Sequence, residues 1–525
     1  MINSMKNRIV FFIIILVPSF VCSQETDSLA EHFSREVRAG LLEKHLAVIA
    51  SDAYEGRETG RKGQKMAAQY IRQEFLRLGL KPGNDTSFIQ TYPLVVRKPG
   101  NIDFVVNGTG YVYKKDFYTL PRPDFEDQTL EANEVVFVGY GINDSVSGYS
   151  DYKKGTNING KVVVIYYGEP VKADGNFLIS GNAEQSEWSI SLLKKMNTAK
   201  KGGARAVLFV SSEDPAAIQK NSRGSGERIK TPSGKSEKKE TLVFHISKAM
   251  ADKMMGIDLD AFNKKNLAKG KPKTISRKLK LKIDIHRDEP GYSGENVIGI
   301  IEGSSKKDQY VFITAHYDHL GIINNEIYNG ADDDGSGTVS VLALAQAFEK
   351  AKEQGHGPER SIVFMTVSGE EKGLLGSAWY VDHPTIPLKN IVCDLNIDMI
   401  GRVDDIHKAE QNYVYIIGSD KLSSELHLLN EKANTDHTKL KLDYTYNDPN
   451  DPNRFYYRSD HYNFAKNDIP VVFYFNGVHA DYHQETDEIS KINFGLMEKR
   501  ARLVFFTAWE LANRPGRIVV DSHKK

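Results

Sequence analysis

Short strand-like runs alternate with helical segments throughout residues 296–513, and this alternation leaves few fold classes open. The runs are rich in Val, Ile and Phe and comprise residues 297–301, 310–314, 361–367, 391–397 and 471–475. The clearest helical patterns cover residues 338–352 and 493–513. The alternation predicts an α/β fold with a mixed, largely parallel central sheet flanked by helices. Active sites in such sheets gather at the carboxyl ends of the strands, so the chemistry is expected there.

Residues that could bind a metal ion follow the run 310–314. His316 and Asp318 point to the same side of an extended chain, so the Asp318 carboxylate could orient the imidazole of a metal-bound His316. Asp333 lies between two other aspartates in a glycine-rich turn that begins the helix 338–352. Three carboxylates could merely cap that helix. So dense a cluster of like charge nonetheless favours a divalent cation, and Asp333 could bridge two of them.

The remaining strand-like runs are also followed by acids or by an imidazole. Glu370 and Glu371 follow the run 361–367, where one could ligate a metal while the other accepts the proton of a metal-bound water. Asp398 follows the run 391–397 in an apolar context, where an ionised carboxylate needs a partner. His483 lies in a loop after the run 471–475. Together these residues predict a metal centre at the carboxyl edge of the sheet.

The ligand types indicate which metal this centre would hold. Two imidazoles and three carboxylates suit two zinc ions that share a bridging aspartate and keep open positions for water and substrate. Calcium and magnesium seldom recruit two histidines. Cobalt or manganese remains open from the ligands alone.

In order and spacing, residues 296–513 resemble the di-zinc aminopeptidase and glutamate carboxypeptidase group, metallopeptidase family twenty-eight. The resemblance rests on Ala315-His316-Tyr317-Asp318-His319, on the turn 329–337, on Glu370-Glu371, on Asn396-Ile397-Asp398, on Ser459-Asp460-His461 with Ile469-Pro470, and on Tyr482-His483. It implies peptide hydrolysis with two zinc ions per chain and peptides as substrates.

The resemblance also implies a role for each matching residue. His316 and Asp398 would hold one zinc ion. Glu371 and His483 would hold the other, and Asp333 would bridge the two. The three residues expected to assist the reaction are Glu370 as general base, Asp318 as the acid that steadies His316, and Tyr482 as a phenol that stabilises the oxyanion.

The chain is expected to divide into a signal peptide, a peptidase domain in two parts and an inserted domain. Residues 1–23 have the basic start, apolar run and small-residue exit of a signal peptide. Residues 24–131 and 276–525 would form the peptidase domain. Residues 132–275, rich in β-branched runs, resemble a protease-associated (PA) domain, on the motifs 137–142, 159–164 and 199–207.

The amino-terminal sequence and the composition indicate where the protein is located and which partners it would bind. The signal peptide predicts a periplasmic or extracellular protein, and lipid anchoring at Cys22 is less favoured because Val21 is bulky. The 69 basic and 69 acidic residues balance, so no net field attracts nucleic acid, and no further stretch is long enough for a stable membrane span. Cys393 would be the single cysteine of the mature chain and is expected to be buried. The sequence leaves the oligomeric state unknown.

Alternatives to the aminopeptidase remain open at this point. Acids near the metals could receive a free α-ammonium group, which favours an aminopeptidase. A carboxypeptidase or dipeptidase on the same fold could instead use Arg454 or Arg458 to bind a terminal carboxylate. The complete ligand set and base argue against an inactive binding protein, and the two-metal set with the inserted domain argues against glutaminyl cyclisation.

Overall fold

The computed structural model describes residues 28–119, 128–152, 156–172, 174–211, 228–231, 241–267, 272–288 and 291–522. The predicted signal peptide and Cys22 lie outside these residues. The chain divides into two compact units, one made of residues 1–92 and 293–525 and the other of residues 93–292, and each is described by itself. Within the described residues, no helix has the length and apolar character needed to cross a membrane.

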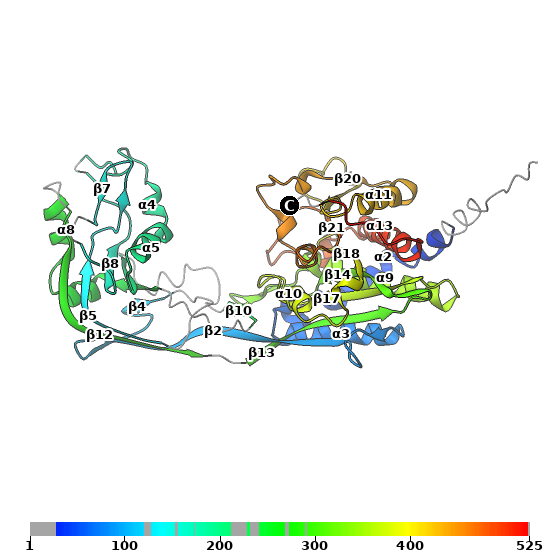
Figure 1. Cartoon of the computed structure of the whole chain (residues 1–525), viewed down its shortest axis with the longest axis horizontal. Helices are drawn as coiled ribbons and strands as arrows, with labels where there is room; N and C mark the ends of the chain where they lie inside the picture. The colour runs from blue at the N-terminus through cyan, green and yellow to red at the C-terminus, as the bar shows by residue number, and fades with distance from the viewer. Residues whose placement is uncertain are drawn as a thin grey trace, which may run out of the picture. The chain divides into compact units, whose positions relative to one another are not determined.

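The first unit is built on a mixed sheet, as the sequence predicts (Figure 1). Its strands run in the order β1–β13–β17–β14–β18–β21–β19–β20. Their bounds are β1 Lys81–Pro82, β13 Gly291–Ile301, β14 Lys306–His316, β17 Arg360–Val367, β18 Ile391–Ile397, β19 Tyr413–Ile417, β20 Lys441–Asp443 and β21 Val471–Phe475. The four central strands, β17, β14, β18 and β21, are parallel to one another.

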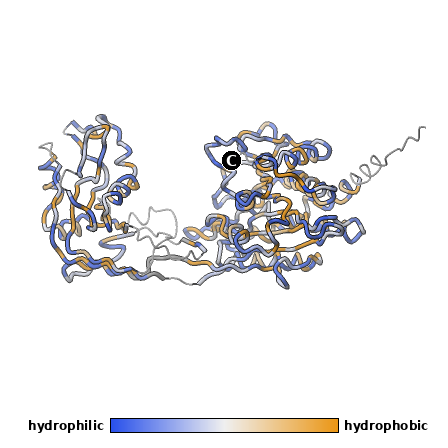
Figure 2. The backbone as a smooth tube through the Cα atoms, in the orientation of Figure 1, coloured by the Kyte–Doolittle hydropathy of each residue, from blue (hydrophilic) through white to orange (hydrophobic). Residues whose placement is uncertain are grey.

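Helices cover both faces of this sheet. The helices are α2 Ala39–Ile49, α3 Lys62–Arg77, α9 Gly337–Glu353, α10 Leu375–Asp382, α11 Ser424–Ala433, α12 His461–Ala465 and α13 Phe494–Asn513. Val311 and Ile313 of β14 belong to the larger core, with α2, α3, α9 and α13, whereas Phe312 between them packs with α10 and α12 on the other face. Successive strand residues point to opposite faces, so a strand buried on both sides reads as a continuous apolar run. Figure 2 shows this apolar character along the strands and polar residues on the outer loops.

The parallel register brings the strand ends level with one another. His316 at the end of β14 is opposite Val367 at the end of β17, and Ile397 at the end of β18 is opposite Tyr474 of β21. The chain segments that follow these strands therefore leave the sheet at one edge. Cys393 of β18 is fully buried, as expected.

The second unit contains another mixed sheet with the order β3–β2–β12–β5–β8–β9–β11–β4. Its strands include β2 Ile89–Val106, β3 Thr109–Tyr111, β4 Phe117–Tyr118, β5 Gln128–Phe137, β8 Val162–Tyr166, β9 Ala206–Ser211, β11 Leu242–Ser247 and β12 Ile275–Asp288. Helices α7 Lys248–Met255 and α8 Leu259–Leu267 cover one face, and α5 Leu192–Lys201 covers the other.

The boundaries of this unit differ from the predicted insertion at 132–275. The unit begins at Pro93 and ends at Tyr292. The difference arises because β2 and β12 are long strands that pair with each other from Lys98 to Val106 and from Leu281 to Asp288. The predicted limits fall within β5 and at the first residue of β12, so they leave β2 and its pairing with β12 outside the insertion.

Candidate metal centre

The segments at the carboxyl edge of the first unit's sheet bring together all five predicted metal ligands. The Nε2 atom of His316 lies 3.4 Å from Oδ1 of Asp333 and 3.5 Å from Oδ1 of Asp398. The Nε2 atom of His483 lies 3.1 Å from Oδ2 of Asp333 and 3.3 Å from Oε2 of Glu371. Asp333 thus presents one carboxylate oxygen to each imidazole, which is the arrangement expected of a bridging ligand.

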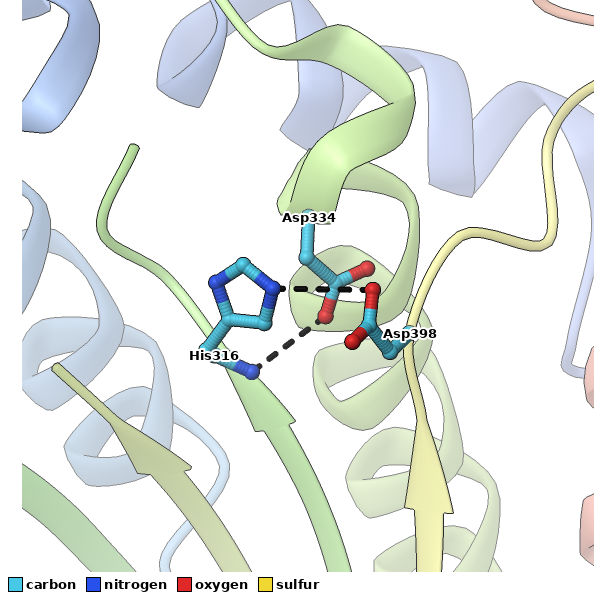
Figure 3. Close-up of side chains that lie close together, drawn as sticks. All are labelled: His316, Asp334 and Asp398. Atoms are coloured by element: carbon cyan, nitrogen blue, oxygen red, sulfur yellow. Dashed lines mark hydrogen bonds and ion pairs between the residues drawn. The ribbon is translucent and has the colours of Figure 1, made fainter. Parts of the chain in front are cut away.

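Asp333 is distinguished from its two neighbours by what their carboxylates bind. Asp334 accepts hydrogen bonds from the backbone N–H groups of His316, Met399 and Gly337, at 3.2, 3.0 and 2.9 Å. Figure 3 shows Asp334, at the turn before α9, beside His316 and Asp398. The Asp334 carboxylate therefore ties together the segments that carry two ligands, and three of its acceptor positions are occupied.

The Asp332 carboxylate also has partners for both of its oxygens. Its Oδ1 accepts the N–H of Gly401 at 2.7 Å, and its Oδ2 lies 3.1 Å from Nε2 of His479. The Asp487 carboxylate accepts the N–H groups of both Asp332 and Asp333, at about 3.0 to 3.2 Å. The backbone of the turn is thereby fixed so that the Asp333 side chain faces the imidazoles.

The residues expected to assist the reaction lie next to these ligands. Glu370 places Oε2 4.0 Å from Nε2 of His316, and its backbone N–H donates to Asp318 at 3.2 Å. The Asp318 carboxylate lies 3.8 Å from Nδ1 of His316, whereas its backbone oxygen lies 3.2 Å from that atom. The ring of Tyr482 stacks on that of His483, with centroids 3.9 Å apart.

The two neighbouring glutamates have different electrostatic environments. Burial and the carboxylates of Glu371 and Asp398 raise the pKa of Glu370 well above its ordinary value, against the opposing effect of His316. Burial also acts to raise the pKa of Glu371, but the imidazoles of His319 and His483 outweigh it and lower the pKa to about 2. Glu371 is therefore the better anionic ligand and Glu370 the better proton acceptor and donor.

His319 was not among the predicted ligands, although the structure places it at the centre. Its Nδ1 lies 2.9 Å from Oε1 of Glu371 and 3.9 Å from Oδ2 of Asp333, and the residue is fully buried. Strand alternation predicts that His319 faces away from His316. The structure differs because β14 ends at His316, so the alternation stops there.

Unpaired buried atoms show that this group of side chains fits metal ions. In the described part of the chain, five such atoms of the centre make no hydrogen bond, although several lie close to another atom of the centre: Nε2 of His316, Nδ1 and Nε2 of His319, Oδ2 of Asp333 and Oε1 of Glu371. Buried polar atoms are normally paired, and nitrogen and carboxylate ligands at these separations suit zinc. Two groups of side chains have ligand atoms close enough together to hold one ion each: His316 with Asp334 and Asp398, and His319 with Asp333 and Glu371. Asp333 also faces His316, and His483 faces both Asp333 and Glu371.

The centre opens into a cavity with an aromatic wall. Ligands and Glu370 form one side, and Met399, Phe455, Phe473 and Phe475 line another. Arg458 and Tyr482 also line the cavity, and the Arg458 guanidinium donates to the Tyr482 hydroxyl at 3.2 Å. Apolar side chains therefore line the cavity beside the metal centre.

A cluster of imidazoles and carboxylates at the carboxyl edge of a sheet is the kind of site in which metal-dependent hydrolases bind their metal. Residues 296–508 match the model described as Peptidase family M28, so this part of the chain is similar to the domains of that family. The predicted family resemblance is thus confirmed.

Relatives and solved structures agree with this family. The chain is 30% identical to Aminopeptidase YwaD of Bacillus subtilis over 34% of its length and 35% of that protein, and 31% identical to a probable leucine aminopeptidase of Arthroderma benhamiae over 41% of its length and 57% of that protein. The chain therefore spans between about a third and three fifths of these relatives.

The likeness of fold extends further along the chain than the likeness of sequence. An aminopeptidase from Aneurinibacillus sp. strain AM-1 matches with a TM-score of 0.51 at 19% identity and covers 94% of this chain and 98% of its own. BSAP, a zinc aminopeptidase from Bacillus subtilis, matches with a TM-score of 0.51 at 19% identity, over 92% and 99%. The predicted fold class is confirmed.

Proposed function

We propose that the protein is an exported two-zinc exopeptidase that removes amino-terminal residues from peptides. The observation that carries this proposal is the placement of Asp333, whose two carboxylate oxygens each face a different imidazole, 3.4 and 3.1 Å away. The family of the domain, and the aminopeptidase names of its relatives, support the choice of reaction. Export rests on the signal peptide predicted at residues 1–23.

Zinc bound here would supply Lewis-acid chemistry, which activates water and polarises a peptide carbonyl. Glu370, with its raised pKa, would take the proton of the attacking water and return it to the departing nitrogen. The Tyr482 hydroxyl lines the same cavity and would donate a hydrogen bond to the developing oxyanion. The aromatic wall of Phe455, Phe473 and Phe475 would receive the side chain of the residue to be released.

A second candidate, a dipeptidase or carboxypeptidase, is favoured by the position of Arg458. This guanidinium lines the cavity beside the metal ligands, where it could bind a free carboxylate. Arg454 does not line this cavity, and its guanidinium lies over the Tyr457 ring at 4.8 Å. Arg458 is therefore the arginine to test for carboxylate recognition.

A defined peptide mixture distinguishes the two candidates. Peptides free or blocked at each end are incubated with zinc-loaded protein, with and without a zinc chelator, and the products are identified by mass spectrometry. Chelator-sensitive release of single residues from free amino termini supports the aminopeptidase. Cleavage only of substrates with a free carboxyl terminus, lost in Arg458→Gln, supports the second candidate, and no cleavage contradicts both.

A further inference from the structure

Arg57 is a fully buried arginine in the polar turn between α2 and α3, and the reaction described above makes no use of it. Its guanidinium donates four hydrogen bonds, all to backbone carbonyl oxygens. The acceptors are Ile49 at 3.0 Å, Tyr317 at 2.8 Å, Asn329 at 2.6 Å and Gly330 at 2.8 Å. A single side chain therefore joins the end of α2 to two segments that lie 260 and 272 residues further along the chain than Arg57.

Two of these segments carry metal ligands. Tyr317 directly follows His316, and Asn329 and Gly330 begin the turn that contains Asp333. The guanidinium thus spans the loop of the first imidazole and the turn of the bridging carboxylate. A change in either segment would alter the distance between His316 and Asp333.

Neighbouring residues of Arg57 reinforce the same contact. The carbonyl oxygen of Arg57 accepts the N–H of His319 at 3.2 Å, and the Thr59 hydroxyl donates to the Asp318 carboxylate at 2.6 Å. We call residues Arg57 to Thr59, with these bonds, the brace. The brace holds the segment 317–319 from both its backbone and its side chains.

The backbone that leads into the brace is in an unfavourable, left-handed conformation. Glu55, Gly56 and Arg57 have φ angles of 50, 61 and 51°, in the left-handed region. A Cβ atom at Gly56 would lie 2.4 Å from the carbonyl oxygen of Tyr328 and 2.6 Å from that of Gly321. The left-handed conformation is unfavourable at a residue with a Cβ atom, so the bonds of Arg57 must offset its cost.

Charge adds to the effect of these hydrogen bonds. Burial lowers the pKa of Arg57 to about 10, while the surrounding carboxylates of Asp487, Asp318 and Asp333 act in the opposite direction, so the side chain is charged at neutral pH. A buried cation beneath a cluster of acids reduces their mutual repulsion.

We propose that Arg57 is the positioning residue of the metal centre, and that the brace sets the spacing of His316 and Asp333 that zinc binding requires. The inference rests on the proposed function only in assuming that this centre binds zinc. Residues that orient metal ligands without touching the metal typically change metal affinity by about 10- to 100-fold when they are replaced. Arg57 acts on two ligand segments at once.

The chain offers a matched control in Arg360. This arginine is also buried, and its guanidinium donates to the carbonyl oxygens of Leu511 and Arg514, at 2.9 and 2.7 Å. Arg360 lies at the first residue of β17, whereas the metal centre lies beyond its last residue. Arg360→Gln therefore removes a buried guanidinium and its carbonyl contacts at the opposite end of the sheet.

The test compares zinc binding in full-length wild-type protein, Arg57→Lys, Arg57→Gln, Thr59→Val and Arg360→Gln. Zinc dissociation constants are measured by competition with a chromophoric chelator, and the unfolding free energy of each metal-free protein is measured in urea. Both arginine sites should lose stability. Zinc affinity should fall at least tenfold in the Arg57 variants and by a smaller factor in Thr59→Val, and it should stay within twofold in Arg360→Gln.

Equal zinc affinity in wild type, Arg57→Lys and Thr59→Val would overturn the proposal, as would an equal loss in Arg360→Gln. Thr59→Val removes a single hydroxyl and is therefore expected to fold. It tests the proposal if the Arg57 variants do not fold. No substrate is used. Wild-type protein that binds zinc but cleaves no peptide would refute the proposed function and leave the comparison of zinc affinities intact.

Discussion

Replacing Glu370 by glutamine should separate the proposed proton transfer from metal binding. Glutamine has the shape of glutamate but cannot accept the proton of the attacking water. The two adjacent glutamates differ in their contacts, since Glu371 lies within 2.9 Å of His319 and 3.3 Å of His483, whereas Glu370 lies no closer than 4.0 Å to His316. Glu370→Gln should therefore keep its zinc.

General acid–base catalysis contributes about 10²- to 10⁴-fold to a rate. Since each tenfold corresponds to about 1.4 kcal/mol of activation free energy, the expected loss in Glu370→Gln is about 3 to 5 kcal/mol. The assay measures kcat and KM on an aminoacyl substrate, together with zinc per chain by elemental analysis. The lost activity should appear in kcat rather than in KM, because the substrate contacts are unchanged.

Glu371→Gln is the matched control on the neighbouring residue. It should lose both activity and bound zinc, because it removes an anionic ligand that His483 and Asp333 cannot replace. A Glu370→Gln protein with near-normal kcat would refute the assignment of Glu370 as the base. A Glu370→Gln protein that loses zinc as readily as Glu371→Gln would refute the division of roles between the two residues.

Two further predictions follow from buried groups. Asp333→Asn should reduce bound zinc at both positions, because Asp333 faces both His316 and His483, and retention of two zinc ions per chain would contradict its bridging role. Burial lowers the pKa of His461 from 6.5 to about 3. Between these two pH values the imidazole is neutral in the folded protein and protonated in the unfolded chain. Its contribution to stability is complete above pH 6.5 and falls by up to about 5 kcal/mol as the pH approaches 3. Urea unfolding of wild type and His461→Phe at pH 7 and pH 4 tests this, and an equal loss of stability in both proteins would contradict it.

Periodicity predicted the elements that are buried on both faces. The five strand-like runs correspond to β13, β14, β17, β18 and β21, and residues 338–352 and 493–513 correspond to α9 and α13. These segments are long and apolar, so burial alone determines their pattern. The strands β19 and β20 were not predicted. β20 is short, whereas β19 is as long and as buried as β21.

The limits of the second unit could not be found from composition. The strand β2 runs from Ile89 to Val106, and the second unit begins within it at Pro93. The residues before and after Pro93 are of similar composition, so composition does not mark the boundary. Strand pairing between β2 and β12 joins residues that are distant in the sequence, and the sequence of one strand does not indicate which other strand it pairs with. Whether the second unit is a PA domain stays a prediction.

The candidate metal centre was likewise predicted only in part. Residue type and position at strand ends predicted which side chains gather, but only the backbone contacts of Asp332 and Asp334 explain why Asp333 is the one left free. The role of Arg57 was not predicted, because its acceptors are carbonyl oxygens that any residue supplies. A motif of polar and glycine residues in a turn gives no sign of such contacts.

Zinc titration of the metal-free protein tests the central claim most directly. Protein stripped by a chelator is titrated with zinc while the release of single residues from a peptide with a free amino terminus is followed. The account predicts no release without zinc and full activity at two equivalents of zinc per chain. Activity that persists in the metal-free protein, or a protein that binds two equivalents of zinc and releases no amino-terminal residue, would contradict it.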